Sequence, residues 1–174
     1  MELIEKAKKI QCVICDVDGV LTDGRLYIDN FGNEQKAFNV QDGMGLKLLM
    51  YAGIEVAVIT TARAPLVDLR IKQLDIRHYF KGQLEKETAY ETLKSQLQLP
   101  DHAFAYIGDD LPDIAILKRV GLSVAVANAV PQVKEVALWT TQFSGGMGAV
   151  REVCDFILNS QGKFDEALRG YFAA

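Results

Sequence analysis

The chain has 174 residues, of which 49% are hydrophobic and 24% are charged. This length fits one domain around one core, and the composition excludes an intrinsically disordered chain. With 19 basic and 23 acidic residues the net charge is −4. That balance excludes a general basic field of the kind that draws a protein onto nucleic acid or an anionic membrane.

The compartment signals favour the cytoplasm. No apolar run approaches the roughly 20 residues of a membrane-spanning helix, and the first residues lack the apolar stretch of a secretory signal. Three cysteines cannot form a closed set of disulfides, which suits a reducing compartment. Cys12 and Cys15 form a C-x-x-C pair inside an apolar run, where this spacing sends them to opposite faces of a strand. We therefore expect two core residues rather than a metal or redox site.

Short apolar runs alternate with helical patterns along the chain. The runs, which predict strands buried on both faces, span residues 11–15, 54–59, 103–107 and 122–126. Helical patterns fall near 2–9, 44–52, 65–74, 86–98, 111–119, 131–136 and 148–160. This alternation favours right-handed crossovers and a parallel sheet. We predict a single α/β domain over 1–174, built on a Rossmann-like, doubly wound parallel sheet.

One segment interrupts the alternation. Residues 25–28 and 34–38 flank a turn rich in Asp, Asn and Gly, which predicts a β-hairpin over about 25–38. A two-stranded hairpin is marginally stable alone, so its Leu, Tyr, Ile and Phe side chains need a surface to cover. A contact between subunits is one candidate. A hairpin folded back onto its own domain is the other.

Carboxylates follow the apolar runs, at the edge where open parallel sheets bind their ligands. Asp16 and Asp18 follow the first run and, being two residues apart, lie on the same side of an extended strand. Asp109, Asp110 and Asp113 follow the third run. Two carboxylates about 4 Å apart repel by roughly 4 kcal/mol at an effective dielectric near 20, so the cluster needs a proton or a cation. Oxygen ligands favour a hard cation, and Mg²⁺ is the usual one.

A hydroxyl and an ammonium join these acids. Thr60 follows the second run, and the fourth helix begins near Lys86. An aspartate nucleophile can form an aspartyl-phosphate, a second aspartate can protonate the leaving oxygen, and Mg²⁺, Lys and Thr can neutralise the transferring group. The set therefore predicts phosphoryl transfer.

The stretch Asp16-Val17-Asp18-Gly19-Val20-Leu21-Thr22 resembles the first motif of the haloacid dehalogenase superfamily. The other three motifs follow in order at Thr60, at Lys86 and at Gly108-Asp109-Asp110 with Asp113. By this resemblance Asp16 is the nucleophile and a metal ligand. Asp18 is the general acid and base, and it binds the metal through its backbone carbonyl.

The same resemblance implies roles for the later motifs. Asp109 is the third protein ligand of the metal, and Thr60 binds the phosphoryl oxygens. Asp110 and Asp113 support the site by orienting metal-bound waters or Lys86. For Asp110 a solvated loop acid or a helix cap is the alternative.

Most members of the superfamily insert a cap domain, but the loops of this chain are too short to hold one. The wider sequence is similar to one capless, homotetrameric branch, the 3-deoxy-D-manno-octulosonate 8-phosphate phosphatases of lipopolysaccharide biosynthesis. The resemblance rests on four blocks: 23–27, 38–45, Gly82-Gln83 and 145–154. It implies a homotetramer whose hairpins form the central contact, with the C-terminal tail at about 161–174 reaching toward a neighbouring active site.

The resemblance also implies a sugar-binding set. In addition to Asp18 and Lys86, this set comprises Asn39, Val40, Gln41, Asp42, Gly43, Lys47 and Arg70. For Lys47 and Arg70 the alternative is a charge on the solvent face of a helix. Two positions depart from the family pattern. Ala62 and Gln41 stand where the family usually has arginine, so the match to the family is weaker for sugar recognition than for the phosphoryl chemistry.

Several alternatives stay open at this point. Gly145-Gly146-Met147-Gly148 is either a backbone nest for an anion or a flexible turn before a helix. The amphipathic tail either docks on a neighbour or frays. The chain is either the octulosonate phosphatase, a phosphatase of a related nine-carbon sugar acid 9-phosphate, or a non-catalytic binding or regulatory module that has kept the fold.

Overall fold

The computed structural model describes residues 2–173. Six parallel strands form one sheet in the order β5-β4-β1-β6-β7-β8. They are β1 (Cys12–Cys15), β4 (Glu55–Ile59), β5 (His78–Phe80), β6 (Phe104–Gly108), β7 (Leu122–Ala125) and β8 (Trp139–Thr140). The predicted parallel sheet is confirmed, and its four predicted strands are β1, β4, β6 and β7.

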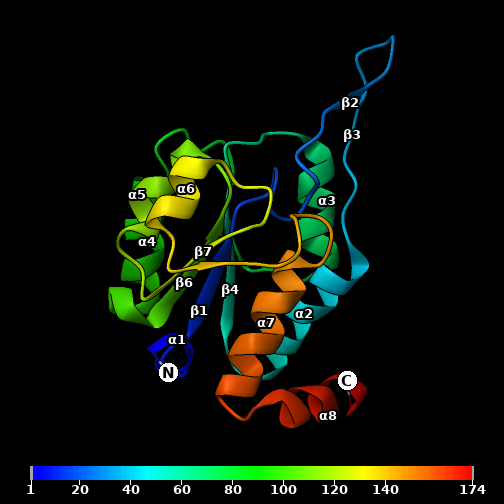
Figure 1. Ribbon diagram of the computed structural model, residues 1–174. Helices are drawn as coiled ribbons and strands as arrows, with labels where there is room; N and C mark the ends of the chain where they lie inside the picture. The colour runs from blue at the N-terminus through cyan, green and yellow to red at the C-terminus, as the bar shows by residue number, and fades with distance from the viewer. Residues whose placement is uncertain (1, 174) are drawn as a thin grey trace.

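Helices cover both faces of the sheet (Figure 1). One face carries α2 (Val40–Tyr51), α3 (Pro65–Gln73) and α7 (Ala149–Ser160), and the other carries α4 (Lys86–Leu97), α5 (Ile114–Leu117) and α6 (Pro131–Val136). Helix α1 (Glu2–Ala7) precedes β1, and 3₁₀ turns span Asp101–Ala103 and Leu111–Asp113. Because the chain turns to opposite faces after β1 and after β6, a crevice opens beyond their carboxyl ends.

The core explains the apolar runs. All four residues of β1 are buried between β4 and β6. Cys12 and Cys15 are free thiols inside this core, as predicted. No helix among residues 2–173 has both the length and the apolar character to cross a membrane.

Two strands and one helix start differ from the prediction. Strands β5 and β8 were not predicted, because they have only three and two residues and lie at the sheet edges. Helix α2 begins at Val40 rather than near residue 44. The side-chain oxygen of Asn39 accepts a hydrogen bond from the Gln41 N–H and caps the helix at this earlier point.

The hairpin consists of β2 (Tyr27–Ile28) and β3 (Glu34–Gln35), and its tip projects from the body of the molecule (Figure 1). The Asp29 carboxylate accepts hydrogen bonds from the backbone N–H groups of Phe31 and Asn33 and fixes the turn. The apolar side chains near the tip are exposed, Ile28 by 63% and Phe31 by 91%. The tip therefore does not fold back onto its own domain.

The C-terminal tail is helical. It forms α8 (Phe164–Ala173), which packs against α2 of the same chain. Ala167 is buried there, and the Tyr171 ring meets the Tyr51 ring edge-on at 5.9 Å between centroids. The tail therefore has a packing surface in its own chain that the sequence did not reveal, on the C-terminal part of α2. The expected approach to a neighbouring active site stays a prediction.

Candidate active site

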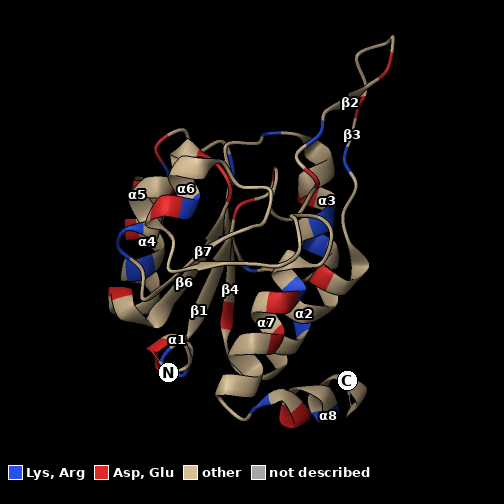
Figure 2. Ribbon diagram, viewed as in Figure 1, with Lys and Arg blue, Asp and Glu red and all other residues tan. Residues whose placement is uncertain are grey.

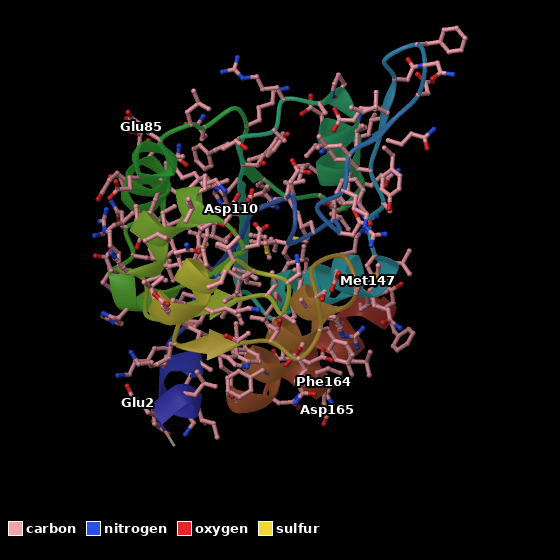
Figure 3. All side chains as sticks on the ribbon, turned by 45° about the horizontal axis from the view of Figure 1, so that its top comes forward. Glu2, Glu85, Asp110, Met147, Phe164 and Asp165 are labelled. Carbon is pink, nitrogen blue, oxygen red and sulfur yellow. The ribbon has the colours of Figure 1, made fainter. Side chains whose placement is uncertain are left out.

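The polar residues after the central strands meet at one edge of the sheet, where Figure 2 shows acidic segments in the loops beyond the strand ends. Asp16 follows β1, Asp109 follows β6 and Lys86 begins α4. They open onto a pocket of about 190 Å³. Its lining consists of Asp16, Asp18, Gly24, Thr61, Lys86, Asp109, Asp110 and Pro112. Figure 3, which turns this edge forward, places Asp110 over the middle of the sheet and Phe164 and Asp165 at the far end.

A buried lysine joins two of the aspartates. The Lys86 Nζ lies 2.9 Å from Asp16 Oδ2 and 2.7 Å from Asp113 Oδ1, with 1% of the lysine side chain exposed. Burial alone would lower the pKa of Lys86, but the two carboxylates outweigh it and raise the pKa above its usual value. The lysine is therefore a fixed ammonium beside the Asp16 carboxylate.

Asp113 has a full set of donors. Its Oδ1 accepts from Lys86 Nζ and from the Tyr106 hydroxyl, at 2.7 and 2.6 Å. Its Oδ2 accepts from the backbone N–H groups of Asp109 and Asp110, at 2.8 and 3.2 Å. Each carboxylate oxygen is thus occupied, which leaves Asp113 to hold Lys86 and the β6 loop rather than to bind a metal directly.

The Asp109 carboxylate, in contrast to that of Asp113, lacks donors. Among the described residues its Oδ1 is a buried side-chain oxygen without a hydrogen-bond partner. Gly19, at a φ of +86°, makes room for this carboxylate, since a Cβ there would lie 2.0 Å from Asp109 Oδ2. Burial, followed by the charges of Asp16 and Asp113, raises the pKa of Asp109 to about 8. An unpaired buried carboxylate of this kind fits a metal ligand.

The donor set fits Mg²⁺. Carboxylate oxygens of Asp16, Asp109 and Asp113 lie within 4.8 Å of one another. Each Asp113 oxygen already accepts two hydrogen bonds, whereas each Asp16 oxygen has one partner and Asp109 Oδ1 has none among the described residues. Asp16 and Asp109 therefore keep lone pairs that could bind a cation. Burial raises the pKa of Asp16 to about 6, although the neighbouring Lys86 ammonium lowers it in part. All available ligands are oxygens, as a hard divalent cation requires.

Asp18 lines the pocket, and its carboxylate forms an ion pair with a lysine other than Lys86. Its Oδ1 lies 2.6 Å from the Nζ of Lys36, which leads out of β3. Lys36 was not predicted as a site residue, because a lysine in a hairpin gives no sign that its side chain reaches the loop after β1.

The two threonines after β4 differ in exposure. The Thr60 side chain is buried, and its hydroxyl accepts a hydrogen bond from the Ala62 N–H at 3.0 Å. Thr61 lines the pocket instead. Arg63, which follows Ala62, packs over Gly82, where a Cβ would lie 2.8 Å from Arg63 Nε.

The glycine-rich loop at 145–148 supports the first motif. A Cβ on Gly145 would lie 1.7 Å from the Gly19 carbonyl oxygen, so only glycine permits this approach. Asn128 ties the two loops together by donating to the Gly19 carbonyl and accepting from the Gly145 N–H. The N–H of Gly146 donates to Val20, and that of Gly148 donates to Asp42. The loop amides are therefore occupied within the fold, and the anion nest is not supported.

Part of the expected sugar-binding set lies near the pocket. Asn39 donates to the Gly146 carbonyl at 3.4 Å, and Arg70 donates to the Asn39 carbonyl at 3.2 Å. Gly43 lets Arg70 approach, since a Cβ would lie 2.4 Å from Arg70 Nη2. Val40 and Gln41 are exposed at the start of α2.

Two members of that set take other roles. The buried Asp42 carboxylate accepts from the N–H groups of Gly148 and Arg151 and caps the start of α7. Lys47 lies further along α2, with its Nζ 3.4 Å from Asp75 Oδ2, in a cavity at the amino end of β4. Within one chain neither side chain reaches the acidic pocket, because the length of α2 carries Lys47 away and helix capping turns Asp42 inward.

Comparison with known proteins places this geometry in a family. A family model of haloacid dehalogenase-like hydrolases matches residues 73–152. A 3-deoxy-D-manno-octulosonate 8-phosphate phosphatase of Yersinia pestis is 48% identical over 166 residues, which cover 95% of this chain and 89% of that protein. The chain belongs to this phosphatase family. A 3-deoxy-D-manno-octulosonate 8-phosphate phosphatase of Moraxella catarrhalis, solved with magnesium, phosphate and the sugar KDO, is 42% identical. It covers 98% of each chain with a TM-score of 0.93.

A second solved structure shares the fold even more closely. A haloacid dehalogenase superfamily hydrolase of Legionella pneumophila is 64% identical, with a TM-score of 0.99 over 99% of this chain and 95% of that one. The family placement therefore extends over the whole sheet and both helical layers, in agreement with the resemblance found in the sequence motifs.

The raised pKa values of Asp16 and Asp109 make the metal site of this phosphatase family member sensitive to pH. With pKa values near 6 and 8, these carboxyls hold protons in the folded, metal-free protein that the unfolded chain would release. The free energy of unfolding without metal therefore falls as the pH rises from about 4 to 8, and a bound cation replaces the protons that the two carboxyls lose.

We expect calorimetry to show Mg²⁺ binding that strengthens from pH 6 to pH 8. Affinity independent of pH would contradict this expectation, and Asp109→Asn is the matched variant that removes the site.

Proposed function

We propose that the chain is a Mg²⁺-dependent phosphatase that hydrolyses 3-deoxy-D-manno-octulosonate 8-phosphate to the free sugar acid and phosphate, on the route to lipopolysaccharide. The observation that carries the proposal is the buried Asp16 carboxylate, which faces the pocket between the Lys86 ammonium and the unpaired Asp109. The family relatives supply the substrate, since their names state it.

The chemistry follows from these positions. Asp16 attacks phosphorus and forms an aspartyl-phosphate, while the bond between phosphorus and the sugar oxygen breaks and Asp18 gives that oxygen a proton. Asp18 then takes a proton from the water that hydrolyses the aspartyl-phosphate. Asp16, Asp109 and the Asp18 backbone carbonyl would hold Mg²⁺, which would supply positive charge to the phosphoryl oxygens.

Other side chains complete the phosphoryl site. Lys86 neutralises charge beside Asp16, and Asp113 and Tyr106 hold that lysine in place. We assign the contact with the phosphoryl oxygens to Thr60 through its backbone and to Thr61 through its hydroxyl, because Thr61 lines the pocket. Asp110 borders the same pocket, and its carboxylate caps the turn at Leu111.

The sugar extends from the phosphoryl site toward the start of α2. Asn39, Val40 and Gln41 lie there, with Arg70 behind them on the Asn39 carbonyl. A sugar acid carries a carboxylate as well as a phosphate, so a cation on this side would add affinity. Gln41 offers an amide instead, and we expect it to hydrogen-bond the sugar without pairing with its carboxylate.

Side-by-side phosphate release with Mg²⁺ tests the substrate. The compounds to compare are octulosonate 8-phosphate, a nine-carbon sugar acid 9-phosphate and a hexose phosphate. A preference for the first supports the proposal, and a preference for the second moves the chain to the nine-carbon alternative. No turnover of any of them would favour a non-catalytic module, against which the complete set of Asp16, Asp18, Lys86 and Asp109 argues.

We further propose a homotetramer built through the hairpins. The support is an apolar hairpin tip that none of residues 2–173 covers, with Leu26 67% and Phe31 91% exposed. Exposure of such an apolar surface to water is unfavourable.

Sedimentation should give the mass of four chains for the wild type and a smaller mass for Ile28→Asp/Phe31→Asp. Leu69→Asp is the control, because Leu69 is as exposed as Ile28 but lies on α3. A wild-type monomer would contradict the proposal.

The state of the cysteines supports the cytoplasm as the compartment. All three cysteines are described, and each is a buried free thiol. Burial raises the pKa of Cys154 well above its usual value, so the thiol stays protonated. Such thiols suit a reducing environment.

A further inference from the structure

The two lysines buried deepest in ion pairs serve the two aspartates of the first motif. Lys86 pairs with Asp16, whereas Lys36 pairs with Asp18 at 2.6 Å and with Glu34 at 2.7 Å. The Lys36 side chain is only 2% exposed, while that of Lys94, in an ion pair of similar length, is 29% exposed. Lysine is rarely buried unless it is paired. The base of the hairpin thus places the buried Lys36 ammonium against one carboxylate oxygen of Asp18.

The contact determines where the Asp18 carboxylate lies. Among the described residues Lys36 is the hydrogen-bond partner that the Asp18 side chain has, and it occupies Oδ1. Asp18 also lines the acidic pocket, with 38% of its side chain exposed. A carboxylate exposed to this extent would sample several rotamers if its one fixed contact were lost.

We propose that Lys36 is a positioning residue that holds the Asp18 carboxylate on the leaving-group side of the phosphoryl site. The proposal rests on the proposed function, in which Asp18 protonates the departing sugar oxygen. General acid catalysis contributes about 10²- to 10⁴-fold, and a misplacement of about 1 Å can cost 10²-fold. The hairpin would then contribute to catalysis through one side chain as well as to assembly.

The test exploits the need of the leaving group for a proton. A sugar alcohol is a strongly basic leaving group and needs the proton, whereas 4-nitrophenolate leaves without one. The value of kcat/KM covers only the steps up to cleavage of the ester bond. It therefore reports the acid role of Asp18 and not its later role as the base that activates water. In Lys36→Met we expect kcat/KM to fall by about 10- to 100-fold for the sugar phosphate and by less than about threefold for 4-nitrophenyl phosphate.

Matched variants separate this role from a structural one. Lys94→Met removes an ion pair of similar length far from the site and should leave both values unchanged. Lys36→Arg keeps the charge and should preserve the ratio of the two values. In the Asp18→Asn background, Lys36→Met should add less than about threefold, because two residues that act as one unit are not additive.

Two results would overturn the proposal. One is an equal loss on both substrates in Lys36→Met, and the other is a ratio that falls as far in Lys36→Arg as in Lys36→Met. The proposed substrate is tested separately by the turnover of the wild type. If the wild type prefers another sugar phosphate, that compound replaces the octulosonate and the ratio still decides the role of Lys36.

Discussion

Replacing Asp16 with asparagine should lower kcat by at least about 10⁴-fold, because an amide cannot take the phosphoryl group as a carboxylate does. The fold should persist. Asparagine has the same shape, and its carbonyl oxygen can still accept from the Val17 N–H or from Lys86, as the carboxylate does at 2.6 and 2.9 Å. The loss of a buried carboxylate also relieves its repulsion with Asp109. Circular dichroism and thermal unfolding should therefore resemble those of the wild type.

A neighbouring acid provides the control for this variant. Asp23 lies in the same loop, and its carboxylate accepts from the Tyr27 hydroxyl and the Arg25 N–H at the protein surface. Asp23→Asn should keep most of the activity. Retention of a tenth or more of the wild-type rate in Asp16→Asn would contradict the assignment of the nucleophile.

The second large effect is expected for Lys86→Met. Removal of this ammonium leaves Asp16 and Asp113 buried without their cation, and breaking a buried ion pair costs about 3–5 kcal/mol in the free energy of unfolding. The rate should fall by about 10²- to 10³-fold, the size of loss seen when one preorganised donor to a developing charge is removed.

Denaturant unfolding in the presence of a chelator measures the stability term directly. Lys94→Met is the control, because its ion pair with Asp101 is partly exposed and such pairs contribute at most about 1 kcal/mol. Mg²⁺ should restore part of the lost stability of Lys86→Met, since it supplies positive charge to the same carboxylates. A loss below about 1 kcal/mol without metal would show that Lys86 is not the charge that holds the acids together.

The sequence was sufficient for the sheet and for the residues at its carboxyl edge. Parallel strands buried on both faces are short apolar runs, and the polar residue after each run must lie at the edge where ligands bind. Asp16 and Asp109 could be located in this way, and Lys86 could be located at the start of the fourth predicted helix. The edge strands β5 and β8 could not, because two or three residues show no period.

The contacts around these residues required the structure. Tyr106 lies in the middle of an apolar strand, and its position predicts a core residue. In the structure its hydroxyl donates a hydrogen bond to Asp113. The contact of Lys36 with Asp18 joins the base of the hairpin to the loop after β1, and no local sequence pattern specifies this contact. The amphipathic tail indicated that α8 needs a partner but not that α2 of the same chain provides it.

In the proposed mechanism the Asp16 carboxylate takes the phosphoryl group from the substrate. The most direct measurement is acid quenching of the enzyme during turnover of octulosonate 8-phosphate with Mg²⁺, followed by mass spectrometry of the peptide that contains Asp16. We predict a phosphorylated Asp16 in the wild type and in Asp18→Asn, and none in Asp16→Asn. Turnover without a phosphorylated Asp16, or phosphate on another residue, would contradict the account.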